Sequence, residues 1–136
     1  MRPIKYIAVH CTATAQSAKV ENIQNYWREH LGWKTPGYHF IIKPNGEVVR
    51  LLPIDQVSNG VAGFNQSTIN ISYIGGVTAK NVPVDNRTPG QKAALTLLLT
   101  NLKAAFPNAI IQGHRDFPKV KKACPSFDAK TEYQNI

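Results

Sequence analysis

The sequence predicts one α/β domain, residues 1–136, built on a central β-sheet of about five strands flanked by helices. Five short apolar segments alternate with two helical patterns, and 43% of the residues are hydrophobic, which is typical of a globular chain. A chain of 136 residues is long enough to bury one core without disulfides or a structural metal. No repeat or low-complexity tract indicates a second domain.

The first third of the chain begins with a strand and continues with a helix. Residues 4–10 alternate loosely and are rich in Ile, Val and Tyr, which predicts a mostly buried strand that ends in His10. Residues 12–17 are small and polar and are expected to form a loop at the rim of any site there. Residues 18–31 have apolar positions three and four apart, which predicts a helix that Gly32 stops.

The middle of the chain is predicted to contain three further strands. A turn at residues 44–46 joins two hairpin strands, 38–43 and 47–52. Residues 53–68 are loop-like, and surface loops of this kind carry substrate contacts more often than the scaffold does. Residues 69–76 predict a central strand.

Tyr38 and His39 are adjacent in the first hairpin strand, so only one of them can face a shared cleft. Alternation places Tyr38 on the face of Phe40 and Ile42, and His39 on the face of Ile41. Periodicity does not decide which of the two faces is functional.

The last third holds the clearest helix. Thr88 is a good N-cap, Pro89 suits the first turn, and Gln91 completes a capping-box pattern. An apolar stripe predicts that this helix covers one face of the sheet; it consists of Leu95, Leu98, Leu99, Leu102 and Phe106. A strand over residues 109–113 then leads to His114, and a short polar helix or tail follows Pro125.

Three residues of ligand type stand at the ends of the predicted elements. His10 and His114 each end a strand, and Cys124 lies in a basic loop against a proline. Two imidazoles and one thiolate are the three protein ligands that a catalytic zinc site uses while its fourth position stays open for water. His30 lies at a helix end, where the dipole favours a cation, and is assigned no catalytic role.

The two cysteines are expected to remain unpaired. Neighbouring strand side chains point to opposite faces, so Cys11 and His10 cannot both face the same site. Cys11 is therefore expected to be a small buried apolar residue, and Cys124 is the ligand candidate.

Four segments, spanning positions 9 to 128, together carry a resemblance to a known family: Val9–Thr14, Gly37–Ile42, Gly113–Asp116 and Lys122–Asp128. In this order they closely resemble the zinc-dependent N-acetylmuramoyl-L-alanine amidases, which include phage amidase lysozymes and animal peptidoglycan-recognition proteins. The resemblance implies a fold of that type with a central mixed β-sheet. It also implies hydrolysis of the amide bond between the lactyl group of N-acetylmuramic acid and L-alanine in peptidoglycan.

The resemblance also implies roles for individual residues. His10, His114 and Cys124 match the ligands of one zinc ion, which would activate a water for attack on the amide. Tyr38 matches the family's tyrosine beside the zinc, and Lys122 matches the basic residue that stabilises the oxyanion.

The residues alone favour plainer readings of both catalytic candidates. Tyr38 would be a strand aromatic in the core, and Lys122 one of four solvated cations in residues 115–122. Lys121 is the immediate rival of Lys122, and the Lys-Ala-Cys spacing of the family selects Lys122.

Three further residues are expected near the site, and two positions depart from the family. Thr12 and Asn65 are predicted to contact substrate. Asp116 is predicted to support a metal ligand or the local structure without touching the metal itself. Relatives often carry histidine where Gly60 aligns, and they usually carry glycine where Asn70 stands. Asparagine tolerates unusual backbone angles better than most residues.

The chain is strongly basic. Sixteen Lys and Arg against eight Asp and Glu give a formal charge of +8, which favours polyanions such as nucleic acid, envelope polymers or an acidic protein. The cations are scattered, so specific nucleic-acid recognition is not expected. No apolar stretch approaches the length of a membrane span, and a monomer is expected.

Several settings for the activity stay open. The first residues lack the apolar core of a signal peptide, so the protein is expected to be made in the cytoplasm. A cytosolic amidase that recycles muropeptides would fit these features. A phage or prophage lysis enzyme, which reaches the wall after release through a membrane hole, fits them equally well or better. A non-catalytic peptidoglycan-binding module is the alternative of a different class, but such modules typically lack the cysteine that Cys124 provides. A regulatory role, such as polymerase binding, is neither supported nor excluded.

Overall fold

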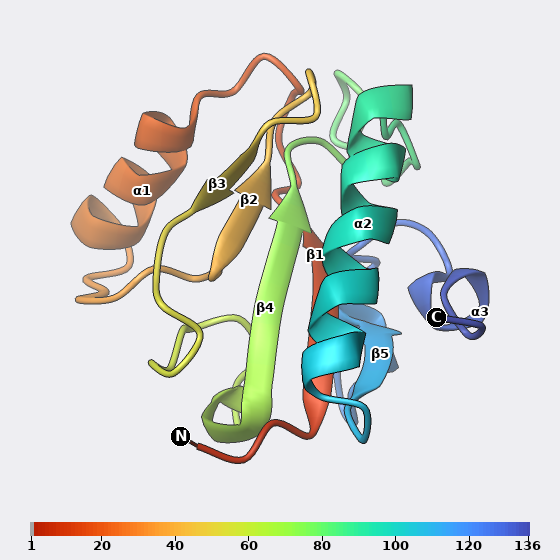
Figure 1. The fold of residues 1–136 in the computed structure, drawn as a ribbon. Helices are drawn as coiled ribbons and strands as arrows, with labels where there is room; N and C mark the ends of the chain where they lie inside the picture. The colour runs from red at the N-terminus through yellow and green to blue at the C-terminus, as the bar shows by residue number, and fades with distance from the viewer. Residues whose placement is uncertain (1) are drawn as a thin grey trace.

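The computed structural model describes residues 2–136 and contains a five-stranded sheet in the order β3-β2-β4-β1-β5 (Figure 1). The strands are Tyr6–Cys11 (β1), Phe40–Ile42 (β2), Val48–Arg50 (β3), Thr68–Tyr73 (β4) and Ile110–Gly113 (β5). β1 pairs in parallel with β4 and β5, β2 pairs in parallel with β4, and the β2–β3 hairpin is antiparallel. The predicted mixed sheet of about five strands is confirmed.

The helices lie on both sides of this sheet (Figure 1). They are Val20–Glu29 (α1), Pro89–Ala105 (α2) and Ala129–Glu132 (α3), and two 3₁₀ turns occur at Asn65–Ser67 (η1) and His114–Asp116 (η2). The residues of α2 pack in the same buried cluster as the odd-numbered residues of β1, whereas α1 packs against Ile41 and Ile74 in another cluster. None of the helices in residues 2–136 combines the length and the hydropathy needed to cross a bilayer.

The capping box predicted for α2 is present. The Thr88 hydroxyl accepts a hydrogen bond from the Gln91 backbone N–H at 3.0 Å, and the Gln91 side chain accepts one from the Thr88 N–H at 3.0 Å. From this start, Leu95, Leu99 and Leu102 are buried against the sheet. As a result α2 covers one face of the sheet, and the opposite face is free of this helix.

Alternation along β1 separates the core from the site. Ile7, Val9 and Cys11 point into the cluster that α2 covers, so Ala8 and His10 point to the other face. His10 is 1% exposed at the end of the strand. The central position of β1, between β4 and β5, therefore fixes His10 in the middle of the sheet's carboxyl edge.

The predicted boundaries of several elements were too generous, and one prediction about faces was wrong. β2 begins at Phe40, because the chain bends at Gly37 and His39 before it enters the sheet. Tyr38 therefore packs in the cluster of Ile41, not on the face of Phe40. The period of two holds only within a regular strand, and Tyr38 precedes the strand.

Candidate active site

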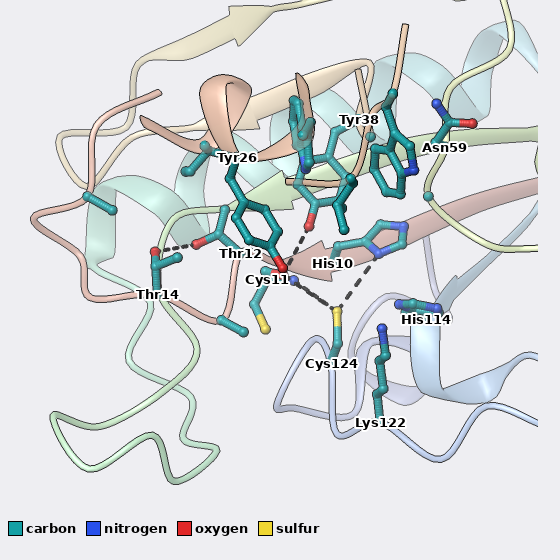
Figure 2. Close-up of a pocket in the computed structure, with 18 of the residues that line it drawn as sticks. His10, Cys11, Thr12, Thr14, Tyr26, Tyr38, Asn59, His114, Lys122 and Cys124 are labelled. Carbon is teal, nitrogen blue, oxygen red and sulfur yellow. Dashed lines mark hydrogen bonds between the residues drawn. The ribbon is translucent and has the colours of Figure 1, made fainter. Parts of the chain in front are cut away.

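The three predicted ligand residues meet at the carboxyl edge of the sheet (Figure 2). One ligand atom from each of His10, His114 and Cys124 lies within 4.8 Å of the others. β1 and β5 are parallel neighbours with Val9 opposite Gly113, so the residues that follow these two positions, His10 and His114, emerge side by side. This arrangement could hold one metal ion.

The turn that carries His114 is stabilised by its own backbone and by the cysteine loop. The Asp116 carboxylate accepts a hydrogen bond from the Gly113 N–H at 2.9 Å, which closes η2. The Arg115 N–H donates to the Cys124 carbonyl at 2.9 Å. Asp116 thus contacts the backbone of the turn, and the His114 and Cys124 segments are joined directly.

The loop that carries Cys124 is held against the sheet at several points. The Tyr73 hydroxyl donates to the Pro125 carbonyl at 2.7 Å, and the Ser126 hydroxyl donates to the Gly76 carbonyl at 2.8 Å. The Cys11 N–H donates to the Cys124 sulfur at 3.2 Å, an interaction that favours the thiolate. A Cβ atom at Gly113 would lie only 2.7 Å from Pro125, so glycine is required for the loop to approach this closely.

The His10 ring has a defined orientation. Its Nε2 lies 2.8 Å from the Asn70 Oδ1, and because an amide oxygen only accepts, Nε2 carries the proton. The unprotonated Nδ1 then faces the Cys124 sulfur at 3.8 Å. His10 thus presents a lone pair to the space that the three ligand residues share.

Burial keeps both histidines neutral. It lowers the pKa of His10 to about 3, with a further contribution from His114, and it lowers the pKa of His114 to about 4, with a further contribution from the Lys122 charge. A neutral imidazole is the form that binds a metal. Contact with the Cys11 side chain, together with burial, raises the pKa of the Cys124 thiol, so its proton must leave when a cation binds.

Tyr38 and Lys122 stand beside the three ligand residues (Figure 2). The Tyr38 ring lies 5.0 Å from the His10 ring, and its hydroxyl donates to the Cys11 carbonyl at 3.3 Å. Burial raises the pKa of Tyr38 far above its usual value, so the hydroxyl stays protonated as a donor. His39 is fully buried on the other side of the backbone and bonds to the Gln56 carbonyl.

These residues occupy one end of a cavity of about 750 Å³. The wall on the α1 side consists mainly of apolar and aromatic side chains, namely Ala18, Ile23, Tyr26, Trp27, Leu31 and Trp33. A mostly apolar cleft with a few convergent polar groups is typical of a small-molecule or substrate site.

The family of this chain follows from its sequence. A family model described as N-acetylmuramoyl-L-alanine amidase matches residues 1–127. The chain belongs to this amidase family.

Comparisons with individual proteins support this family assignment. The endolysin of Klebsiella phage KP32 is 40% identical over 126 residues, which cover 91% of the amidase described here and 82% of the relative. The endolysin of Escherichia phage T7 is 37% identical, with the same coverage of both chains. The solved Ph2119 endolysin from Thermus scotoductus MAT2119 bacteriophage Ph2119 superposes with a TM-score of 0.79 at 28% identity, over 92% of this chain and 79% of its own. The predicted family, amidase activity and endolysin-like type are confirmed.

The two predicted substrate contacts of the amidase differ in position. Thr12 lines the cavity, and its hydroxyl accepts from the Gly75 N–H at 3.0 Å. Asn65 lies outside the cavity lining, and its Oδ1 accepts from the backbone N–H groups of Gly60 and Val61 at 3.0 and 2.7 Å. The Asn65 amide thus closes its own loop, whereas Asn59 lines the cavity.

Sequence reasoning missed the aromatic wall of the amidase. Tyr26 and Trp27 fit the apolar period of α1 equally well as core residues, and Trp33 fits a turn. The Trp27 ring stacks on Trp33 with centroids 6.3 Å apart, and both line the cavity. The density of aromatic residues between positions 26 and 38 is the signal that could have identified this wall.

Proposed function

We propose that this amidase is a zinc enzyme of phage-type cell-wall lysis, in which His10, His114 and Cys124 hold one zinc ion. The observation that carries the proposal is the convergence of these three ligand atoms within 4.8 Å at one end of the cavity. Tyr38 and Lys122 are proposed as the catalytic side chains, because they line the cavity beside the ligands.

The donor set fits zinc. Two imidazole nitrogens and one thiolate are borderline and soft ligands, which suit zinc better than calcium or magnesium. Three protein ligands at the wall of an open cavity leave the remaining position to water or substrate. A zinc ion bound here supplies a Lewis acid and a water that is acidic near neutral pH.

In this proposal two side chains of the protein stabilise the negative charge that develops on the substrate carbonyl oxygen. Lys122 brings a positive charge to the cavity, where negative charge develops on the carbonyl oxygen as the amide is attacked. The protonated Tyr38 hydroxyl is a second donor that lines the same cavity. Its present bond to the Cys11 carbonyl is long, at 3.3 Å, so it is readily exchanged for a substrate oxygen.

Peptidoglycan is the proposed substrate, and lysis the proposed role. The amidase family acts on the bond between N-acetylmuramic acid and L-alanine, and the relatives cited above are phage endolysins that match over most of both chains. We propose that the protein acts on the wall after release from the cytoplasm. The apolar cavity wall would accommodate the substrate on the side away from Lys122.

Mass spectrometry of peptidoglycan digests tests the proposal. Purified sacculi are incubated with zinc-loaded protein, with and without a chelator, and soluble muropeptides are treated in parallel. We expect free stem peptides that begin with L-alanine, and their loss with the chelator. Protein that sediments with uncut sacculi and leaves muropeptides intact would indicate a binding module, and cleavage of muropeptides alone would indicate recycling.

A further inference from the structure

We propose that Asn70 is a positioning residue that holds the His10 ring with Nδ1 toward the metal, and that Gly60 is required for this role. The inference rests on the proposed zinc site. It concerns two positions at which this chain departs from the resemblance described above: it has asparagine at position 70, where relatives usually carry glycine, and glycine at position 60, where relatives often carry histidine. In the structure these two residues are in contact.

The Asn70 side chain is buried between strands and bonded at both ends. Asn70 is 0% exposed, and its Oδ1 lies 2.8 Å from the His10 Nε2. Its Nδ2 donates to the Ser58 hydroxyl at 2.7 Å. Parallel pairing of β1 with β4 places Asn70 opposite Ala8, on the face that also carries His10.

The direction of these hydrogen bonds is fixed from the far end of the network. The Asn70 backbone N–H can only donate, and it donates to the His39 Nδ1 at 3.0 Å, so Nδ1 is an acceptor and a neutral His39 carries its proton on Nε2. The His39 Nε2 lies 2.7 Å from the Gln56 carbonyl, which accepts that proton, and 3.1 Å from the Arg2 Nη2. The Ser58 hydroxyl lies 3.2 Å from the His39 Nδ1 and also donates to it.

It follows that the Asn70 amide has one favourable orientation. The Ser58 oxygen needs a donor, which is the Asn70 Nδ2, so the Asn70 Oδ1 is left for His10. The opposite amide orientation would place a donor on the His10 Nε2 and leave the Ser58 oxygen without its donor. Burial raises the free-energy cost of such a mismatch. The network thus specifies which His10 nitrogen keeps a free lone pair.

Gly60 provides the space for the amide. A Cβ atom at position 60 would lie 2.2 Å from the Asn70 Cγ and Oδ1, well inside any contact that real atoms make. Gly60 itself needs no unusual backbone angle, since it is absent from the glycines with positive φ. The requirement for glycine is therefore steric, and it exists only while asparagine occupies position 70.

The function of the pair is to pre-organise a ligand. A second hydrogen bond on a ligating imidazole fixes its tautomer and orientation, and loss of such a partner typically lowers metal affinity about 10- to 100-fold. We therefore expect Asn70→Ala to bind zinc about 10- to 100-fold more weakly than the wild type. Asn70→Asp keeps an acceptor at the same place and should restore most of the lost affinity.

The experiment combines zinc competition titration with NMR of the metal-free protein. In the wild type the His10 Nε2 proton should give a signal that exchanges slowly with water, with a nuclear Overhauser effect to Asn70. The signal should be lost in Asn70→Ala and retained in Asn70→Asp. Thermal unfolding of each variant verifies that the chain is folded. A His10 proton on Nδ1 in the wild type, or unchanged zinc affinity in folded Asn70→Ala, would overturn the proposal.

A double-mutant cycle tests the part played by Gly60. Gly60→Ala alone should displace the amide and lower zinc affinity about as much as Asn70→Ala does. In the Asn70→Gly background, Gly60→Ala should have little further effect, because the steric conflict is gone. Additive losses would refute the link between the two positions. A wild type that binds no zinc would instead refute the proposed function.

Discussion

The ring of Trp27 packs edge-on against the ring of Tyr38, with 5.3 Å between centroids and 79° between planes. Tyr38 is thereby held between α1 and His10, whose ring lies 5.0 Å away on the other side. A helix without any ligand residue thus positions the hydroxyl that we propose as a donor. Through Tyr38, the aromatic wall is in contact with a residue of the proposed metal site.

Tyr38→Phe removes the hydroxyl and keeps both ring contacts. We expect kcat to fall about 100-fold, because one donor to the developing oxyanion is lost, while zinc content stays unchanged. The control is Tyr6→Phe, which removes a hydroxyl from a ring packed against Phe64 and Phe117, outside the cavity lining. Unchanged kcat in Tyr38→Phe would mean that Tyr38 contributes through packing alone.

Lys122→Ala removes a positive charge from the cavity. We expect turnover to fall about 100- to 1,000-fold with zinc still bound. Lys121→Ala is the matched control, since Lys121 is an exposed neighbour outside the cavity lining. Kinetics on soluble muropeptide and metal analysis of each variant are required. Loss of zinc from Lys122→Ala would show that the lysine supports the metal centre instead of the reaction.

His114→Ala tests the ligand set. The wild type should retain about one zinc ion per chain after dialysis, and the variant should retain little, because two protein ligands hold zinc far more weakly than three. His30→Ala, at the exposed end of α1, should retain the wild-type amount. Equal zinc content in the two variants, measured by atomic emission, would contradict the assignment.

Zinc binding should release about one proton at pH 6. The histidines, with pKa values of about 3 and 4, are already neutral at this pH, so they release none. Cys124, whose pKa is raised, must lose its proton to bind. Cys11, which is not a proposed ligand, has a pKa of about 7 and is mostly protonated at pH 6. Calorimetry in buffers of different ionisation enthalpy measures the number, and release near zero or two would contradict this ligand set.

The metal-free protein should lose stability as the pH falls from about 6.5 towards 4. The pKa values of His10 and His114 are depressed in the folded state, to about 3 and 4, whereas unfolded histidine titrates near 6.5. Between these values the unfolded state binds more protons, so the free energy of unfolding falls as the pH is lowered. Urea unfolding at several pH values measures this. His114→Ala should show a shallower slope in the same range, and an equal slope would contradict the depressed pKa of His114.

Much of this architecture could be predicted from the sequence because it depends on neighbours in the chain. The α2 capping box joins Thr88 and Gln91, three residues apart, and strand and helix periods follow from local geometry. The ligand candidates could be chosen by residue type and by position, since His10 and His114 stand at the ends of predicted strands and Cys124 lies in the loop that follows.

Other features could not be predicted from the sequence, because the pattern of residues within a helix or strand does not specify how the chain bends between one element and the next. The bend at Gly37–His39 breaks the period before β2, so only the folded chain places Tyr38 toward His10 and His39 in the opposite direction. The sequence likewise does not reveal that the Asn65 amide oxygen accepts hydrogen bonds from the backbone of its own loop.

The identity and order of the residues are sufficient to establish the family and the enzyme class and to predict the chemical types of the proposed metal ligands. The partners of those side chains depend on the folded structure. The His10 ring contacts Asn70 because β1 and β4 pair in parallel with Ala8 opposite Asn70. Gly60 lies in a loop that packs against the Asn70 amide, and the absence of a side chain there leaves space for that amide. Such contacts depend on register and distance in space, which positions 10, 60 and 70 do not specify until the sheet has formed.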